Sequence, residues 1–495
     1  MFRKSLAAFP SPPRAKRGHL FLYLLVAGAL LLSGTSLVNA SAQTATTAAL
    51  PALHTEGNRI KNSAGTDVTL KGVSVIAPEQ NAVCTDCNNK PINDLIDMTV
   101  ANGWHSKVLR LLVTEAIGKD LNAYDATYIK PYVDHAVAKG LYVIIDLHLV
   151  RNYGDAAGAV PQADVKGFWD FIAPRYANNP NVLFEVFNEP IAPDGWASWK
   201  SYIQPVVDSI RSVASNVILM GSPSWSTRLN GALTAPITGG DIAYVYHLYP
   251  NQGPATAANL DPKFGTAAAT LPVVLTEFGW DPSSSANNVT AGTTSGWGLP
   301  LRQYLDARPQ IGWLGWIFDN FWAPVMFDKF WNLLSGEYQG AFVRDWLAGA
   351  PAVSPCSDHL ARGATATASS TYDANSGAAK AVDGSCTDSG RWMSAVGDAT
   401  PVLTLNLGAY KTVKQVDVYS GYGYPNVATG TVLVAFNVEG HTSAGWVQLG
   451  SVTGNTRSLV SMTGPSGTID QLRLTVTVPS NTTPDIARVY EVAAH

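Results

Sequence analysis

The sequence has few cysteines, few charged residues and no excess of basic residues. Cysteine occurs 4 times in 495 residues, and charged residues make up only 14%. The formal net charge is −4, and it is −9 outside the first 50 residues, which contain five basic residues and no acidic one. This balance argues against a nucleic-acid partner. Hydrophobic residues make up 46%, which is typical of a folded protein and excludes a largely disordered one.

No apolar segment is long enough to cross a bilayer comfortably. The longest run, residues 20–32 (LFLYLLVAGALLL), follows a basic stretch ending at Arg17, whereas a spanning helix needs about 20 apolar residues. Small residues at 33–42 (SGTSLVNASA) suit cleavage by signal peptidase. We therefore expect residues 1–42 to be a signal peptide with a short linker, no stable membrane span, and a secreted, extracellular or periplasmic protein. An uncleaved N-terminal anchor is the alternative.

Export makes the cysteines potential disulfides. Four cysteines allow three pairings, and proximity in the sequence favours Cys84 with Cys87 and Cys356 with Cys386. A metal-binding or redox role for the Cys84–Cys87 pair is the alternative. No second CxxC or nearby histidine completes a zinc set with it.

Between residues 68 and 348, short β-rich runs alternate with helix-like stretches, such as residues 125–139 and 163–176. We predict eight strands, at residues 68–76, 106–113, 142–147, 182–187, 216–220, 242–246, 272–276 and 311–318. Eight repeated β-α units indicate an α/β fold, a (β/α)8 TIM barrel. A doubly wound open sheet is the rival, but residues 72–77 (GVSVIA) are not the glycine-rich turn that usually follows its first strand.

The composition changes after Trp346. Residues 349–355 are small and proline-containing, and residues 356–495 are rich in Thr, Val, Ser and Gly with alternating apolar positions. We therefore predict a barrel domain at 50–348, a linker at 349–355 and an all-β sandwich at 356–495.

Polar residues gather where the predicted barrel strands end. These ends carry Asp146 and His148, Asn188 and Glu189, His247 and Tyr249, and Glu277. The C-terminal ends of barrel strands form the open face on which catalytic groups meet. Glu189 follows the fourth strand and Glu277 the seventh, so two carboxylates are expected to face each other. At a separation of about 5 to 5.5 Å such a pair cleaves a glycosidic bond with retention, through a covalent glycosyl-enzyme.

At these positions the sequence resembles glycoside hydrolase family 5, over roughly residues 53–348. The matching residues, in the family's order, are Arg110, His148, Asn188-Glu189-Pro190, His247, Tyr249, Glu277 and Trp316. The resemblance implies that Glu189 is the acid/base and Glu277 the nucleophile. It further implies substrate-binding roles around them: Asn188 holds the sugar 2-hydroxyl, Arg110 and Tyr249 keep Glu277 ionised, His148 and His247 line the subsite, and Trp316 stacks beneath the sugar. No cofactor and no metal are expected for catalysis.

Some side chains in the barrel allow a purely structural interpretation. We expect Glu185 to form a core ion pair with Arg110. His105 and His135 are expected at the surface or on a helix. Four tryptophans are equally compatible with sugar platforms and with the core: Trp225, Trp280, Trp297 and Trp322.

The C-terminal segment resembles the discoidin-like, coagulation-factor type C superfamily, which includes carbohydrate-binding family 32. The matching stretches are residues 366–370 (ATASS), 381–384 (AVDG) and Arg391-Trp392. This resemblance implies a jelly-roll sandwich with a possible structural calcium near Asp383. Cys386 departs from the usual pattern and puts the neighbouring loop in doubt. Sugar contacts, if present, are expected from Tyr372, Tyr422 and Tyr424.

Together these features predict a secreted, monomeric, retaining endo-β-1,4-glucanase acting on a polysaccharide or oligosaccharide. A β-mannanase or another β-glycan hydrolase of the same family is the first alternative. The second is a non-catalytic glycan-binding protein, and the third is an enzyme acting on glycolipid.

Overall fold

The computed structural model describes residues 50–495, except residues 86, 102, 286–287, 351–355, 387–389 and 423–428. The predicted signal peptide, most of the predicted linker and Tyr424 lie outside the described residues. Within the described part of the chain, no helix combines the length and apolar character that crossing a membrane requires.

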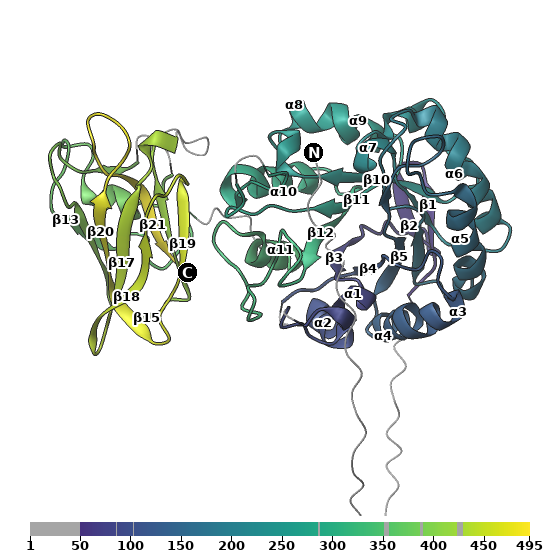
Figure 1. Cartoon of the computed structure of the whole chain (residues 1–495), viewed down its shortest axis with the longest axis horizontal. Helices are drawn as coiled ribbons and strands as arrows, with labels where there is room; N and C mark the ends of the chain where they lie inside the picture. The colour runs from purple at the N-terminus through teal and green to yellow at the C-terminus, as the bar shows by residue number, and fades with distance from the viewer. Residues whose placement is uncertain are drawn as a thin grey trace, which may run out of the picture. The chain divides into compact units, whose positions relative to one another are not determined.

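Eight parallel strands close into a barrel in chain order (Figure 1). They are β3 (Lys71–Val75), β4 (Val108–Val113), β5 (Tyr142–Leu147), β7 (Val182–Glu185), β9 (Ile218–Met220), β10 (Ile242–Leu248), β11 (Val273–Phe278) and β12 (Gly312–Phe318). Each lies within or overlaps one of the eight predicted strands, so the (β/α)8 barrel is confirmed.

The barrel strands are nearly continuous apolar runs because both of their faces are covered. One set of side chains, including Val108, Ile144, Leu219 and Val245, fills the barrel interior. A hairpin of β1 (Leu53–Glu56) and β2 (Arg59–Asn62), which we did not predict, adds Leu53 and Ile60 to this cluster.

Helices surround the barrel and bury its outer face (Figure 1). The longest are α5 (Gln162–Tyr176) and α6 (Trp196–Arg211). In α6, Trp199, Ile203, Val206 and Ile210 recur at helical spacing and are buried. The other α-helices are α1 (Pro78–Val83), α2 (Ile92–Val100), α3 (Leu121–Tyr124), α4 (Lys130–Ala138), α7 (Pro223–Ser226), α8 (Ala257–Leu260), α9 (Thr266–Ala268), α10 (Leu299–Asp306) and α11 (Gln339–Leu347).

The C-terminal residues form two antiparallel sheets. The first is ordered β13 (Thr365–Ala368), β15 (Val402–Thr412), β20 (Thr468–Val478), β17 (Ala435–Thr442) and β18 (Gly445–Val452). The second is ordered β14 (Trp392–Met393), β21 (Arg488–Ala494), β16 (Gln415–Ser420) and β19 (Leu459–Thr463). Leu405 and Leu474 of the first sheet share one hydrophobic cluster with Val418 and Val492 of the second. The jelly-roll assignment and the domain boundaries stay predictions.

Both predicted disulfides are present. Cys84 is bonded to Cys87, with 5.8 Å between their Cα atoms, and Cys356 is bonded to Cys386, with 6.2 Å. The disulfide leaves no thiolate at Cys84 or Cys87 to bind a metal, which argues against the metal-binding alternative, whereas the redox alternative is not tested.

Candidate active site

The eight predicted site residues of the barrel lie on six of its strands or on the segments that follow them. Arg110 lies on β4, His247 on β10, Glu277 on β11 and Trp316 on β12. The remaining four lie after strands: His148 follows β5, Asn188 and Glu189 follow β7, and Tyr249 follows β10. The structure brings them all to the C-terminal ends of the strands, where a barrel's open face lies.

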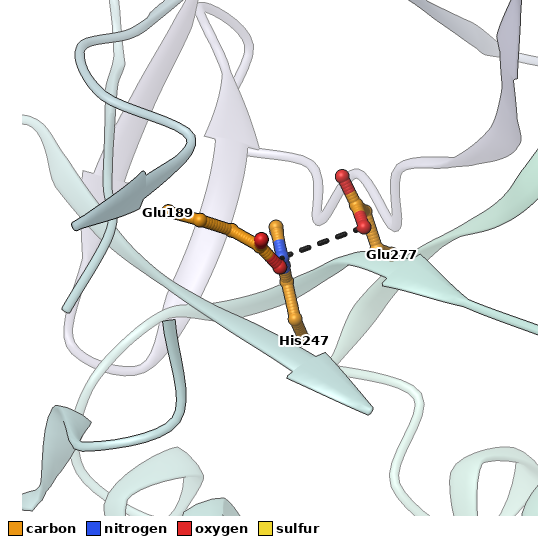
Figure 2. A group of neighbouring side chains, drawn as sticks. All are labelled: Glu189, His247 and Glu277. Carbon is orange, nitrogen blue, oxygen red and sulfur yellow. Dashed lines mark hydrogen bonds and ion pairs between the residues drawn. The ribbon is translucent and has the colours of Figure 1, made fainter. Parts of the chain in front are cut away.

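The imidazole of His247 lies between the carboxylates of Glu189 and Glu277 (Figure 2). Its Nδ1 is 2.8 Å from Glu189 Oε1 and 3.5 Å from Glu277 Oε2. A carboxylate oxygen of each glutamate and a ring nitrogen of His247 all lie within 4.8 Å of one another. These atoms are close enough to hold a metal ion, but we assign none, because His247 already pairs with Glu189 and Arg110 with Glu277.

Arg110 links the buried acids beneath this pair. Its guanidinium donates to Glu185 at 2.7 and 3.0 Å, to Glu277 Oε1 at 2.8 Å and to Asn188 Oδ1 at 2.6 Å. It also lies 3.1 Å from Asp146 Oδ2. Arg110 has no exposed surface, so it positions Glu277 and Asn188 and does not itself face a sugar. The predicted Arg110–Glu185 core ion pair is present in addition.

Glu277 is surrounded by groups that favour its ionised form. Burial raises the pKa of its carboxyl, but the charges of His247 and Arg110 outweigh this, and the pKa lies below its ordinary value. The Tyr249 hydroxyl also donates to Glu277 Oε2 at 2.8 Å. Glu277 is therefore held as a carboxylate.

Glu189 has the opposite tendency. Burial raises the pKa of its carboxyl, the negative charge of Glu277 raises it further, and the hydrogen bond from His247 lowers it only in part. The two glutamates therefore differ in proton affinity, as an acid and a nucleophile must.

The backbone around Glu189 differs from our expectation. β7 ends at Glu185, and Glu189 belongs to a separate short strand, β8 (Glu189–Pro190), which pairs with β6 (Val150–Arg151). The Glu189 amide donates to Leu149 O at 2.9 Å. This two-strand ribbon and a 2.6 Å hydrogen bond from Ser226 Oγ to Asn188 O fix the segment. Asn188 Nδ2 is buried without a hydrogen-bond partner among the described residues.

Trp316 and His148 stack on each other. Their ring centroids are 5.4 Å apart and the rings are nearly parallel, at 6°. Asp146 Oδ2 lies 2.7 Å from His148 Nδ1 and orients that ring. Gln339 on α11 donates to the Trp316 carbonyl at 2.8 Å.

The four ambiguous tryptophans divide between core and surface. Trp280 and Trp297 are core residues, 0% and 4% exposed, and both indole N–H groups donate to backbone carbonyls. Trp322 is half-buried, with its ring 6.2 Å from that of Trp316. Trp225 is 47% exposed and lies in a left-handed run, with φ of 56°, 59° and 54° at residues 224–226.

The two histidines lie where we expected them: His105 is exposed, and His135 on α4 bonds Asp97.

Two residues have roles that we did not predict. Thr276 bonds both His247 and Glu185, and Asp146, which we placed only at a strand end, pairs with Arg110 and His148. A charged residue inside an otherwise apolar strand, as in YVIIDL and VLFE, marks both Asp146 and Glu185, since buried charges need partners. Thr276 carries no such mark, because threonine is common in strands.

Comparison with known proteins identifies the barrel. The profile of the family described as Cellulase (glycosyl hydrolase family 5) matches residues 62–321, more than half of the chain. An endoglucanase from Halalkalibacter akibai is 31% identical over 190 residues, which are 35% of this chain and 23% of that protein. Endoglucanase E-5 from Thermobifida fusca is 28% identical over 303 residues, 58% of this chain and 60% of that protein. The chain thus spans less than two thirds of either relative.

A solved structure supports the same fold. The crystal structure of a beta-glucanase from Saccharophagus degradans matches with a TM-score of 0.52 at 24% identity, over 61% of this chain and 94% of that chain. A structure of the same beta-glucanase in complex with cellotetraose matches equally well. The barrel, the paired glutamates and the family match agree with one another. This chain is a glycoside hydrolase that belongs to glycosyl hydrolase family 5, the cellulase family.

Proposed function

We propose that the protein is a secreted, retaining endo-β-1,4-glucanase that uses Glu189 as acid/base and Glu277 as nucleophile. The observation that carries the proposal is the separation of the two glutamates, which have carboxylate oxygens within 4.8 Å of each other. Retaining enzymes hold their carboxyl groups about 5 to 5.5 Å apart, whereas inverting enzymes leave about 6.5 to 9.5 Å for a water molecule.

In the first step, Glu277 attacks the anomeric carbon while Glu189 gives its proton to the departing glycosidic oxygen. Arg110 and Tyr249 each hold one oxygen of Glu277 at 2.8 Å. They keep the carboxylate ionised and aimed until the covalent bond to the sugar forms.

In the second step, water replaces the departed glycan. Glu189, now ionised, removes a proton from this water, whose oxygen attacks the anomeric carbon and releases Glu277. The imidazole of His247, 2.8 Å from Glu189, stabilises the ionised acid between the two steps.

Three further groups support a sugar subsite beside the glutamates. The free N–H of buried Asn188 is available to a sugar hydroxyl, and an unpaired buried donor is costly unless a ligand satisfies it. The rings of Trp316 and His148 stack on each other and offer the sugar an aromatic contact. We also assign exposed Trp225 as a platform, since its left-handed backbone is of the strained kind that clusters at functional sites.

The choice of β-1,4-glucan follows the similar proteins, which are endoglucanases. A β-mannanase or another β-glycan hydrolase would use the same catalytic set. Reducing-sugar release from carboxymethyl cellulose, mixed-linkage glucan and mannan decides among these substrates.

The decisive experiment compares wild type with Glu189→Gln and Glu277→Gln on the preferred glycan. We expect activity to fall by at least about 10³-fold in each, and proton NMR to show that the first product keeps the β configuration. Glu56→Gln, an exposed acid on the β1 hairpin, is the matched control and should behave as wild type. Unchanged rates in both variants, with glycan still bound, would favour the non-catalytic binding protein instead.

For the C-terminal sheets we propose a discoidin-like, jelly-roll carbohydrate-binding module that tethers the enzyme to insoluble polysaccharide. Tyr372 and Tyr422 are 48% and 51% exposed, as sugar-contacting rings should be. Replacing both tyrosines by alanine should weaken the binding of the protein to insoluble cellulose and leave the hydrolysis of a soluble substrate unchanged.

We further propose a structural calcium near Asp383. The buried Glu491 carboxylate reaches the same loop, where it accepts from the Gly384 amide at 3.1 Å, and carboxylate oxygens are the ligands that calcium prefers. Chelation should lower the thermal stability of these sheets without changing activity on a soluble glycan.

The proposed location is outside the cell, and the proposed oligomeric state is a monomer. The two disulfides support export, because such bonds persist mainly in oxidising compartments.

A further inference from the structure

We propose that Thr276 is a positioning residue: its hydroxyl fixes a proton on Nε2 of His247 and leaves Nδ1 as the atom that shares a proton with Glu189. The inference rests on the proposed role of Glu189 as acid/base. It concerns a residue that is completely buried and so contacts neither sugar nor solvent.

Thr276 lies on β11, directly before Glu277, between two groups that both need a hydrogen-bond partner. Its Oγ1 is 2.9 Å from Glu185 Oε1 and 3.0 Å from His247 Nε2. A hydroxyl has one hydrogen, so it donates to one of these groups and accepts from the other.

The direction of both bonds follows from Glu185. Arg110 holds both oxygens of this carboxylate. Burial raises the pKa of Glu185, but Arg110 and His247 together lower it to about 2. An ionised carboxylate only accepts, so Thr276 donates to Glu185. Its oxygen then accepts from His247, and Nε2 carries a hydrogen.

This assignment determines what Nδ1 does. Nδ1 is the other ring nitrogen, and it lies 2.8 Å from Glu189 Oε1 (Figure 2). With Nε2 occupied, Nδ1 either donates to ionised Glu189 or accepts from protonated Glu189. One proton is thus shared between His247 and the acid. When Glu189 protonates the departing oxygen, it gives up this shared proton, and the site recovers a proton when Glu189 deprotonates the attacking water in the second step.

The acidic groups that face His247 favour a hydrogen on Nε2. Burial lowers the pKa of the ring, but Glu277, Glu185 and Glu189 raise it to about 10. The same site also contains Arg110 from β4, which is paired with Glu185 and Glu277, together with His148 after β5 and Tyr249 after β10.

Loss of the Thr276 hydroxyl would allow His247 to adopt a second neutral form. In this form the neutral imidazole carries its hydrogen on Nδ1 only. It would donate to Glu189 and keep the carboxyl ionised, and an ionised Glu189 cannot act as an acid. Thr276 disfavours that form, because the bare Nε2 would face the oxygen lone pairs of a hydroxyl whose hydrogen already points at Glu185. Thr276 therefore extends the pH range over which Glu189 keeps its proton.

The test is the pH dependence of kcat/KM for Thr276→Val and Thr276→Ser on a soluble glycan. Valine keeps the shape and removes the hydroxyl. We expect its alkaline limb to move about 0.5 to 1 pH unit lower, the shift that one net hydrogen bond produces, with KM within twofold of wild type. Serine should restore the wild-type limb. An unshifted limb in the valine variant, or the same shift in both variants, would overturn the proposal.

A second measurement needs no turnover. Nitrogen NMR of the full chain with ¹⁵N-labelled histidine, with His247 identified by its absence in His247→Asn, should show a hydrogen-bearing Nε2 in wild type and Thr276→Ser up to a higher pH than in Thr276→Val. A bare Nε2 in wild type, or the same pH dependence in all three proteins, would refute the proposal. If no β-glycan is cleaved, the proposed function fails while this comparison still tests the role of Thr276.

Discussion

Glu189 and Glu277 carry the same side chain, but their surroundings give them opposite tendencies toward a proton. Both are buried, which by itself raises both pKa values. Glu277 has His247, Arg110 and a Tyr249 hydrogen bond to offset burial, whereas Glu189 has His247 and the repelling charge of Glu277. The difference in contacts therefore supports the proposed roles of Glu189 as acid and Glu277 as nucleophile.

This difference predicts a bell-shaped pH dependence of kcat/KM. Activity should fall at low pH as Glu277 is protonated and at high pH as Glu189 ionises. Tyr249→Phe removes the hydrogen bond that favours ionised Glu277, so the pKa of Glu277 should rise and the acid limb should move about 0.5 to 1 pH unit higher. The alkaline limb should stay in place.

The matched comparison is Thr276→Val, which is expected to move only the alkaline limb. Steady-state rates over a pH series on one soluble substrate measure both limbs for each variant. Movement of the same limb in both variants would show that the assigned roles of the two glutamates are wrong.

At the scale of elements, close strand pairing in the barrel depends on glycine at particular positions. Gly72 on β3 pairs with Val108 on β4, and a Cβ atom at Gly72 would lie 1.8 Å from the Val108 carbonyl oxygen. That oxygen belongs to the backbone and cannot move without opening the pairing of β3 with β4. Arg110, two residues further along β4, would shift with it.

We therefore expect Gly72→Ala to lower the free energy of unfolding by about 2 kcal/mol or more, as overpacking does, and to reduce activity as well. Gly167→Ala is the control, because Gly167 lies within α5 and its Cβ would meet no atom within 4 Å. It should stabilise the protein by about 0.5 to 1 kcal/mol. Urea unfolding measures both values, and equal effects of the two substitutions would contradict the argument.

At the scale of the whole molecule, the two disulfides differ in the length of chain they close. Cys84 and Cys87 are 3 residues apart, whereas Cys356 and Cys386 are 30 apart. Closing a longer loop restricts the unfolded chain more. The bond that begins the C-terminal segment should therefore matter more for stability than the bond after β3.

Replacing Cys356 and Cys386 by alanine should cost about 3.5 kcal/mol of stability, against about 1.5 kcal/mol for Cys84 and Cys87. Calorimetry of the two double variants measures the difference. Hydrolysis of a soluble glycan should survive both replacements, since none of these cysteines belongs to the group of residues around Glu189 and Glu277. A larger loss from the Cys84–Cys87 pair would show that loop length does not control the effect.

The barrel could be predicted from the sequence, because eight short apolar runs separated by helices have few other ways to bury both faces of a sheet. The positions of His247 and Glu277 along their strands could also be predicted, since a residue's place along a strand is a local property. The sequence did not reveal the β1–β2 hairpin, whose alternation is short, or the separate strand that carries Glu189.

Only the tertiary structure decided how those residues contact one another. The Arg110–Glu277 bond joins residues 167 positions apart, and the Thr276–Glu185 bond joins residues 91 positions apart. Such contacts depend on which strands face each other across the closed barrel and on the angle at which each side chain points inward. The proton held between Glu189 and His247 is therefore a property of the folded barrel, because no local stretch of sequence contains both partners.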